Sequence, residues 1–321
     1  MDSSYYDGVT KSVFFAAAAF VLMLFGCAGT PGETGAAADY YNIGNAYVEL
    51  GQYDRAVDNF QKALRLDPRL AKADFNLALT YARMKRTAEA ETILRRLLQT
   101  DPQNTRLLAA LGWAYHADGR EEDALGQYDA IIAISPADTD ALYNSGIILW
   151  KLGRKAEAID RLRTELSKSP DDTDALFAAG QLLLDLDDPA GSFDMLSRYL
   201  EKKPDDKDAL FSVADGAERM QKYSRALDAY DKIIAADVGQ AKAWFGEARL
   251  LLTVVQDSER GLKALDRALG AGFKDAAAIK VLLETPTLLE RDKVEAALKA
   301  RSLLPAAADA TVPAAGPSAG K

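Results

Sequence analysis

The chain has 321 residues and a net charge of −9, with one cysteine and one histidine. The acidic charge argues against nucleic acid as a partner, since phosphate binding needs clustered positive charge, and one cysteine excludes an internal disulfide or a cysteine-based zinc site. Hydrophobic residues make up 49% of the chain but aromatic residues only 8%, a balance that favours close-packed helices over sheets.

An uncharged apolar run lies near the start of the chain, from Val13 to Gly26. A membrane-spanning helix needs about 20 apolar residues, whereas the apolar core of a secretory signal needs about 7–15. The length of the run therefore predicts a signal peptide over residues 1–26. An uncut signal anchor and a buried apolar segment of the fold are the two alternatives.

The residues that end this run, Leu24-Phe25-Gly26-Cys27, resemble the bacterial lipobox. The resemblance implies that signal peptidase cuts before Cys27 and that this cysteine is the lipidation site, which carries diacylglyceryl and palmitate. Ala28 is not the aspartate that retains lipoproteins at the inner membrane. The resemblance thus favours a periplasm-facing lipid anchor in the outer membrane over one in the inner membrane. Residues 27–36 are small and turn-forming, and we expect a lipidated flexible linker there.

A period of 34 residues governs the chain from Ala37 onward. The first six copies follow one another without an insertion. Successive repeats begin at Ala37, Ala71, Thr105, Thr139, Thr173, Lys207 and Ala241. Such a period indicates one supersecondary unit that is stacked many times.

Three columns of the repeat explain how each copy folds. Position 8 is always Gly or Ala, position 20 is Ala or Ser in the first six repeats, and position 24 is bulky. Small residues let two helices approach closely, so Gly44 and Ala56 mark the crossing of a helical hairpin. Bulky residues such as Phe60 fill the space toward the next repeat. Asp-Pro or Ser-Pro then ends most second helices, because proline disfavours the helical conformation of its predecessor.

The first copy, "AADYYNIGNAYVELGQYDRAVDNFQKALRLDPRL", resembles the consensus of the tetratricopeptide repeat (TPR). The resemblance implies an all-α fold, a right-handed α-solenoid of about seven helix-turn-helix units over residues 37–272. The seventh copy carries a one-residue insertion near Val255 to Arg260. Residues 273–304 read as C-terminal capping helices, since the end of a solenoid must cover an apolar face. The Ala/Pro-rich residues 305–321 are expected to be a disordered tail.

In this family, ligands contact positions 2, 5, 9 and 12 of the first helices, together with position 6 in one ligand mode. Carried over to this chain, the predicted partner groove consists of Tyr41, Asn45, Phe75, Asn76, Arg106, Trp113, Tyr143, Ile147, Trp150 and Phe177. The aromatic residues at position 5 are equally well explained by packing between neighbouring first helices. Trp113 and Trp150 stand where small or polar residues are usual, and they predict an apolar patch together with Tyr143 and Ile147.

The best-known ligand mode of the family is a clamp on a C-terminal carboxylate. Asn45, Asn76 and Arg106 occupy three of its five places, but Tyr41 and Ala110 replace the other two basic residues. With one cation in place of three, the resemblance does not predict this clamp.

Acidic residues gather at the starts of the later repeats, for example Asp140, Asp171 and Asp172. Carboxylates suit helix N-termini, so a solvated acidic edge explains them. The alternative is a surface that favours basic partners. We expect no catalytic residue, no cofactor and no metal site, because the chain has no phosphate loop and no His/Cys metal spacing, and His116 is explained by a structural role.

The sequence therefore predicts a non-catalytic, lipid-anchored TPR scaffold or adaptor of the bacterial cell envelope, which binds a protein or peptide in its concave groove and binds no nucleic acid. Two alternatives stay open. One is a structural or assembly lipoprotein of the outer membrane that forms homo-oligomers. The other is a periplasmic accessory of a transporter that binds a small hydrophobic ligand. Fold alone does not choose among them.

Overall fold

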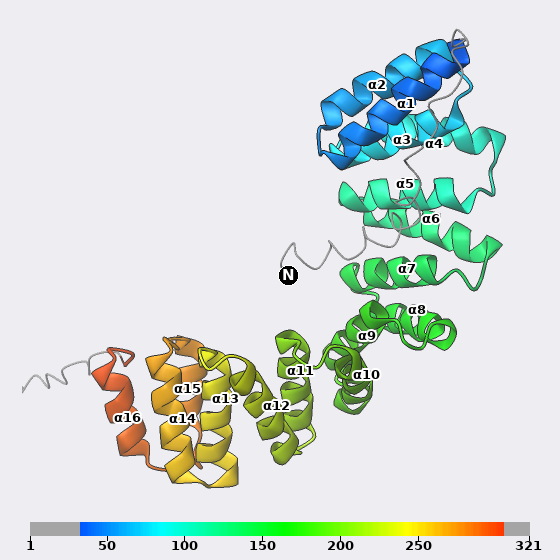
Figure 1. The fold of residues 1–321 in the computed structure, drawn as a ribbon. Coiled ribbons are helices and arrows are strands. Elements are labelled where there is room, and N and C mark those ends of the chain that lie inside the picture. The colour runs from blue at the N-terminus through cyan, green and yellow to red at the C-terminus, as the bar shows by residue number, and fades with distance from the viewer. Residues whose placement is uncertain (1–32, 305–321) are drawn as a thin grey trace, which may run out of the picture. The chain divides into compact units, whose positions relative to one another are not determined.

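A computed structural model describes residues 33–304 of the chain (Figure 1). Within this range the secondary structure is helical throughout, without a strand. The helices are α1 (Glu33–Glu49), α2 (Tyr53–Leu66), α3 (Ala71–Arg83), α4 (Thr87–Thr100), α5 (Thr105–Ala117), α6 (Glu121–Ile134), α7 (Thr139–Lys151), α8 (Lys155–Lys168), α9 (Thr173–Asp185), α10 (Pro189–Lys202), α11 (Lys207–Arg219), α12 (Tyr223–Ala236), α13 (Ala241–Leu250), the π-helical turn η2 (Leu251–Val255), α14 (Ser258–Gly270), α15 (Ala276–Glu284) and α16 (Arg291–Ala300).

The chain divides into two compact units, Met1–Leu182 and Leu183–Lys321. Predictions for the signal peptide, for Cys27 and for the tail over residues 305–321 lie outside the described residues. None of the helices within residues 33–304 is both long enough and apolar enough to cross a membrane.

The predicted repeat is confirmed by the helix boundaries. From the second repeat on, the first helix of each repeat begins at the predicted residue, from Ala71 for α3 to Ala241 for α13. Consecutive helices pack as hairpins, α1 with α2, α3 with α4, α5 with α6 and α7 with α8 in the first unit and α11 with α12 and α13 with α14 in the second, and α2, α4, α6, α10 and α12 also pack against the first helix of the next repeat. Figure 1 shows α1 to α8 stacked in chain order.

Each hairpin closes where a small residue faces a bulky one. A Cβ added at Gly44 would lie 2.6 Å from the ring of Phe60, and one added at Gly112 would lie 3.1 Å from the ring of Tyr128. Ala56, predicted at the same crossing, is fully buried. The bulky residues at position 24 therefore close on their own hairpin as well as filling the space toward the next repeat.

The residue before each first helix often caps it. The side chain of Asn104 accepts a hydrogen bond from the Leu107 amide, and Asp138 accepts one from the Ala141 amide at 2.9 Å. Asp206 caps α11 in the same way. These contacts explain part of the acidic column as N-caps, in agreement with the interpretation as helix-terminal carboxylates.

The first helix begins earlier than predicted. Helix α1 starts at Glu33 and therefore includes residues 33–36, which we had assigned to the flexible linker. Alanine has the highest helix propensity, and Ala36 to Ala38 extend the helix toward its N-terminus.

The seventh repeat absorbs its predicted extra residue in a π-helical turn. Helix α13 continues into η2, and Gln256 then adopts a left-handed conformation with φ of 64°. A π turn holds one residue more than an α turn, so α14 begins at Ser258, one residue later than the period alone would give. The insertion is thereby confined to one turn, and the hairpin of α13 and α14 is kept.

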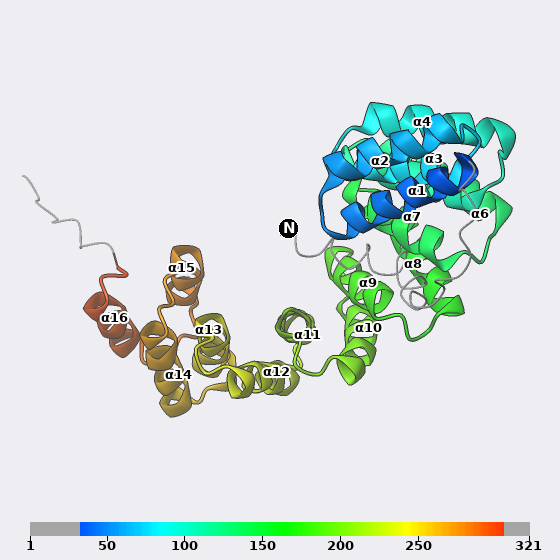
Figure 2. The same cartoon turned by 45° about the horizontal axis from the view of Figure 1, so that its top comes forward.

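The predicted capping helices are confirmed. Ile279 and Leu282 of α15 and Val294 and Leu298 of α16 are buried in one core with residues of α13 and α14. Phe273 stacks on Phe245 with the ring centroids 4.0 Å apart. Figure 2 shows α15 and α16 beside α13 and α14. These helices cover the last repeat, as the end of a solenoid requires.

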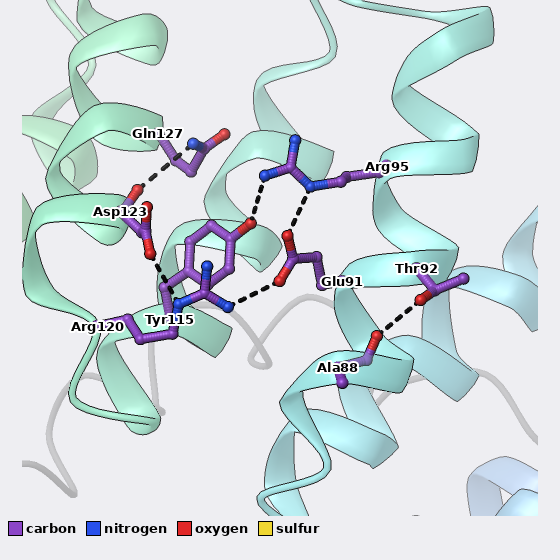
Figure 3. Close-up of polar contacts among 8 residues, drawn as sticks. All are labelled: Ala88, Glu91, Thr92, Arg95, Tyr115, Arg120, Asp123 and Gln127. Carbon is purple, nitrogen blue, oxygen red and sulfur yellow. Dashed lines mark hydrogen bonds and ion pairs between the residues drawn. The ribbon is translucent and has the colours of Figure 1, made fainter.

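A partly exposed ion-pair network ties the second repeat to the third (Figure 3). Arg95 of α4 and Arg120 before α6 both bind the carboxylate of Glu91, at 2.7 Å and 2.8 Å. Arg95 also donates to the hydroxyl of Tyr115, and the guanidinium of Arg120 lies 4.2 Å from the centre of that ring. Burial raises the pKa of Glu91, but the hydrogen bonds from both guanidinium groups and the tyrosine outweigh burial and hold the pKa at about 2.

A second carboxylate, Glu165 of α8, has the opposite surroundings. It is fully buried at a position that other repeats fill with apolar residues such as Ile131, and neither carboxylate oxygen has a hydrogen-bond partner among the described residues. Burial, followed by the charges of Asp172 and Asp140, raises the pKa of Glu165 to about 8. The fold therefore favours the protonated acid.

The closest hairpin crossing gives a test with a matched control. We predict that Gly44→Ala lowers the free energy of unfolding by about 1–3 kcal/mol, because the new methyl group overlaps the Phe60 ring. Gly126 also lies within a helix but has no atom within 4 Å of an added Cβ, so Gly126→Ala should stabilise by about 0.5–1 kcal/mol. Urea unfolding measures both changes. Equal effects at the two sites would contradict the close contact.

The two carboxylates predict opposite pH dependences. The folded-state pKa of Glu165 lies above its ordinary value of 4.5, so the stability that its protonated form provides is lost as the pH rises from 4.5 through 8. Glu165→Gln should remove this loss and stabilise by about 1–3 kcal/mol at alkaline pH. The pKa of Glu91 is depressed, so its contribution is lost as the pH falls from 4.5 toward 2.

Chemical denaturation across this pH range checks both signs, with Glu91→Gln as the counterpart variant. Glu91→Gln should be destabilising at neutral pH and nearly neutral in acid. A Glu165→Gln variant whose stability falls with rising pH as steeply as that of the parent chain would contradict the assignment.

Candidate functional site

The predicted groove residues lie on the first helices of successive repeats. Tyr41 and Asn45 are on α1, Phe75 and Asn76 on α3, Arg106 and Trp113 on α5, Tyr143, Ile147 and Trp150 on α7, and Phe177 on α9. Arg106 is exposed and the other nine are half-buried. Helix α1 packs beside α3, and α3 beside α5. We call the surface formed by these residues on α1, α3, α5 and α7 the first-helix surface.

At the N-terminal end of this surface, three predicted residues bind one another. The side-chain amide of Asn76 donates to Asn45 Oδ1 at 2.7 Å and lies 3.3 Å from the hydroxyl of Tyr41. The ring of Tyr41 also packs against Phe60, with the centroids 6.0 Å apart. The two asparagines are therefore engaged across the α1–α3 contact.

Cations cover the aromatic residues of the first two repeats. The ammonium group of Lys72 lies 4.5 Å from the ring centre of Tyr41, and the guanidinium of Arg106 lies 4.7 Å from that of Phe75. In each pair the cation is at position 2 of the following repeat. Cation–π contacts of this kind contribute about 0.5–1 kcal/mol at exposed sites. Lys72 was not among the predicted groove residues, although its spacing of 31 from Tyr41 repeats in Phe75 and Arg106.

Between α5 and α7 the surface is hollowed into a pocket of about 260 Å³. It is lined by Trp113, His116, Ala117, Tyr128, Asn144, Ile147, Ile148 and Lys151. We call it the α5–α7 pocket. Its wall is mostly apolar, and apart from the Tyr128 hydroxyl and the Trp113 indole nitrogen its polar side-chain groups come from His116, Asn144 and Lys151.

Two of the four residues of the predicted apolar patch line this pocket. Trp113 and Ile147 line the α5–α7 pocket, but Tyr143 and Trp150 do not. Successive residues turn by about 100° around a helix. Tyr143 and Trp150 therefore flank Ile147 on one side of α7, and Asn144 and Lys151, which line the pocket, flank it on the other.

The polar margin of the pocket is built on a buried carboxylate. Glu121, the first residue of α6, is buried and accepts from two pocket residues. His116 Nδ1 lies 2.6 Å from one carboxylate oxygen, and the ammonium group of Lys151 pairs with the other. An ammonium has three donors, so Lys151 can bind Glu121 and still donate to a ligand in the pocket.

The side-chain amide of Asn144 is held at the same margin. The side-chain nitrogen of Asn144 donates to the carbonyl of Asp140, one turn earlier on α7, at 2.7 Å. This bond holds the amide along its own helix. The side chains of Asn144, His116 and Lys151 thus present polar atoms around an apolar wall, the combination typical of a site that takes one apolar group and hydrogen-bonds its surroundings.

The sequence contained a weak signal for the residues that were missed. Asn144 and Lys151 fall on the same helical stripe as Ile147, at spacings of three and four residues. The contact of Lys151 with Glu121 joins residues 30 positions apart and depends on the packing of α6 against α7. Among the described residues, no group of three or more His, Cys, Asp or Glu side chains is arranged to hold a metal ion.

Comparison with known families agrees with the architecture. The family described as TPR repeat matches residues 44–85, and the family described as Tetratricopeptide repeat matches residues 83–139 and 143–207. These matches together span about half of the chain. The chain belongs to the tetratricopeptide repeat family. A search of curated proteins gave no match.

Solved structures resemble the chain in fold. A tetratricopeptide repeat protein from Parabacteroides merdae aligns with a TM-score of 0.53 and 19% identity, covering 77% of this chain and 97% of its own. YrrB, a TPR protein with an unusual peptide-binding site, aligns with a TM-score of 0.54 and 18% identity, covering 59% and 96%. PilW, a type IV pilus biogenesis factor, aligns with a TM-score of 0.53 and 18% identity, covering 64% and 96%. At such identities the likeness concerns the fold.

Proposed function

We propose that this protein is a non-catalytic scaffold that binds a protein or peptide segment on its first-helix surface. The observation that carries the proposal is the α5–α7 pocket, in which the wall of Trp113 meets the polar margin of Lys151 and His116. Half-buried tryptophan dominates the energetics of protein interfaces. Among structures of the same fold, YrrB has a peptide-binding site and PilW is a pilus biogenesis factor, which supports a binding role over catalysis.

The chemistry of the surface describes the segment it would hold. An apolar side chain would fill the α5–α7 pocket, and an acceptor such as a backbone carbonyl or a carboxylate would take the remaining donors of Lys151. Toward α1 the surface offers the cations Lys72 and Arg106, each stacked on an aromatic ring. We propose a segment with one apolar anchor and acceptor or acidic groups on the side that faces α3 and α1.

We also propose that the mature chain is lipid-anchored through Cys27 and faces the periplasm, with the outer membrane favoured over the inner. The support comes from the sequence: the apolar run before Cys27, the lipobox-like residues and the absence of aspartate at Ala28. A lipid anchor would restrict the scaffold to a membrane surface, where a partner in the same compartment would be captured at high effective concentration.

Truncation of the pocket wall tests the binding function. We predict that Trp113→Ala and Ile147→Ser lower recovery of the partner from the cell envelope, with the tryptophan change weakening affinity by about 30-fold, the effect of losing one central aromatic anchor. Ile134→Ser is the matched control, because Ile134 is 40% exposed and lies outside the pocket lining. Partner recovery that is unchanged by Trp113→Ala, in a variant that melts like the parent, would contradict the proposal.

Loss of the thiol tests the anchor. We predict that Cys27→Ser abolishes incorporation of radiolabelled palmitate and leaves the precursor uncut, because the serine cannot form the thioether that precedes cleavage. Labelling is followed on gels of whole cells, and the processed length by mass. Palmitate that is still incorporated into the Cys27→Ser chain would rule out Cys27 as the site.

A further inference from the structure

Helix α1 carries an apolar and aromatic stripe that its own fold leaves open. Tyr40, Ile43 and Tyr47 are spaced by three and four residues, which places them on one face of the helix, and Leu50 follows three residues later, directly after α1 ends at Glu49. Ile43 is 44% exposed and Leu50 is 67% exposed. Tyr40 and Tyr47 are half-buried, and the stripe borders the side that packs on α2, where Ala37 and Gly44 are buried.

The columns of Tyr40, Ile43 and Tyr47 are buried in the second to sixth repeats. At position 7, Leu77 is 5% exposed and Leu111 is 1% exposed, against 44% for Ile43. In α3 and α5 these columns pack against the second helix of the preceding repeat, α2 or α4. No helix within residues 33–304 precedes α1. The stripe therefore occupies the face on which a preceding repeat would stack, and no such repeat is present among these residues. A terminal repeat in solution is expected to have a polar outer face, which this one lacks.

Two cations of α2 accompany the stripe. The guanidinium of Arg55 and the ammonium of Lys62 each lie 5.6 Å from a ring centre, over Tyr47 and Tyr40 respectively. Aliphatic side chains beside tyrosines and long cations are the composition found at the boundary between acyl chains and headgroups. There the rings and aliphatic groups leave water while the cations reach the lipid phosphates.

The position of the stripe in the chain agrees with this composition. Only five residues separate Cys27 from Glu33, where α1 begins, a distance of six residue steps. Even fully extended, they reach about 20 Å, so an acylated Cys27 would hold the start of α1 within that distance of the bilayer. Contact with the surface is then intramolecular, and a weak apolar interaction suffices to keep it.

We propose that the outer face of α1 and α2 docks on the bilayer surface, with Ile43 and Leu50 inserted among the lipids beside Tyr40 and Tyr47. This inference rests on the proposed lipid anchor. A second copy of the chain is less well suited to the face, because a stable interface needs about 20–30 residues a side and the stripe belongs to a single helix. Docking at α1 leaves the α5–α7 pocket, two and three repeats further along the same unit, available to a partner.

A reporter at Leu50 tests the docking. Because acylation consumes the thiol of Cys27, the acylated Leu50→Cys chain has a single free thiol, which can carry an environment-sensitive fluorophore. The protein is reconstituted in vesicles of phosphatidylethanolamine and phosphatidylglycerol. We expect a blue shift of the emission, together with its loss when the vesicles contain doxyl-labelled lipid. Ile134→Cys, an exposed site on α6, is the matched control and should show neither change.

A charge on the stripe provides the second variant. Ile43→Asp in the Leu50→Cys chain should reverse both the blue shift and the quenching, while the chain still floats with the vesicles through its anchor. If the protein floats with the vesicles but the fluorophore at Leu50 shows neither the blue shift nor the quenching, the docking is overturned and the anchor is kept. Spin–spin coupling between copies labelled at Leu50 would assign the face to a second chain and also overturn it. If the chain does not float with the vesicles and Cys27 keeps its free thiol, both the proposed anchor and the proposed docking are contradicted.

Discussion

The structure depends on one steric constraint, the contact of a helix backbone with a bulky side chain of the next helix. At Gly44 the ring of Phe60 leaves no room for even a methyl group, and Gly112 and Tyr128 repeat the arrangement two repeats later. The contact fixes how close the two helices of a hairpin lie and how they cross. Gly146 faces Leu162 in the same way in the fourth repeat, and the period keeps this column small, Gly or Ala, in every copy, so the first helices present the same columns to the first-helix surface.

Because the apolar packing is the same from repeat to repeat, the repeats differ mainly in their polar side chains. The second and third repeats are joined through Glu91, whose charge is satisfied by two guanidinium groups. In the fourth repeat Glu165 replaces an apolar residue and has no partner among the described residues. The third and fourth repeats share the His116, Glu121 and Lys151 cluster at the margin of the α5–α7 pocket. Distinct chemistry is thus added to a regular framework without disturbing it.

Much of the fold could be predicted from the sequence because it is local and periodic. Helix starts such as Ala71 and Ala241 follow from the repeat, and the one-residue insertion was visible before the π turn explained it. The site was predicted less well. Column positions identified Trp113 and Ile147 as surface residues, but they could not show that the pocket opens on the side of Ile147 that holds Asn144 and Lys151 and not on the side of Tyr143 and Trp150.

Nor could the columns show that Lys151 is joined to Glu121, because that contact links side chains of two repeats. The start of α1 at Glu33 was missed for a related reason, since alanines at a repeat boundary are compatible with both a helix and a linker. Contacts between repeats and the ends of the fold are therefore where the structure adds most to the sequence.

The central claim is that the α5–α7 pocket holds a protein segment, and site-specific photo-crosslinking tests it most directly. A photoreactive phenylalanine analogue at Asn144, within the pocket lining, is compared in cells with the same group at Gly126, an exposed position on α6 outside it. The account predicts a discrete protein adduct from Asn144 that Trp113→Ala removes and that Gly126 does not give. Equal adducts from both positions, or an adduct at Asn144 that survives Trp113→Ala, would contradict it.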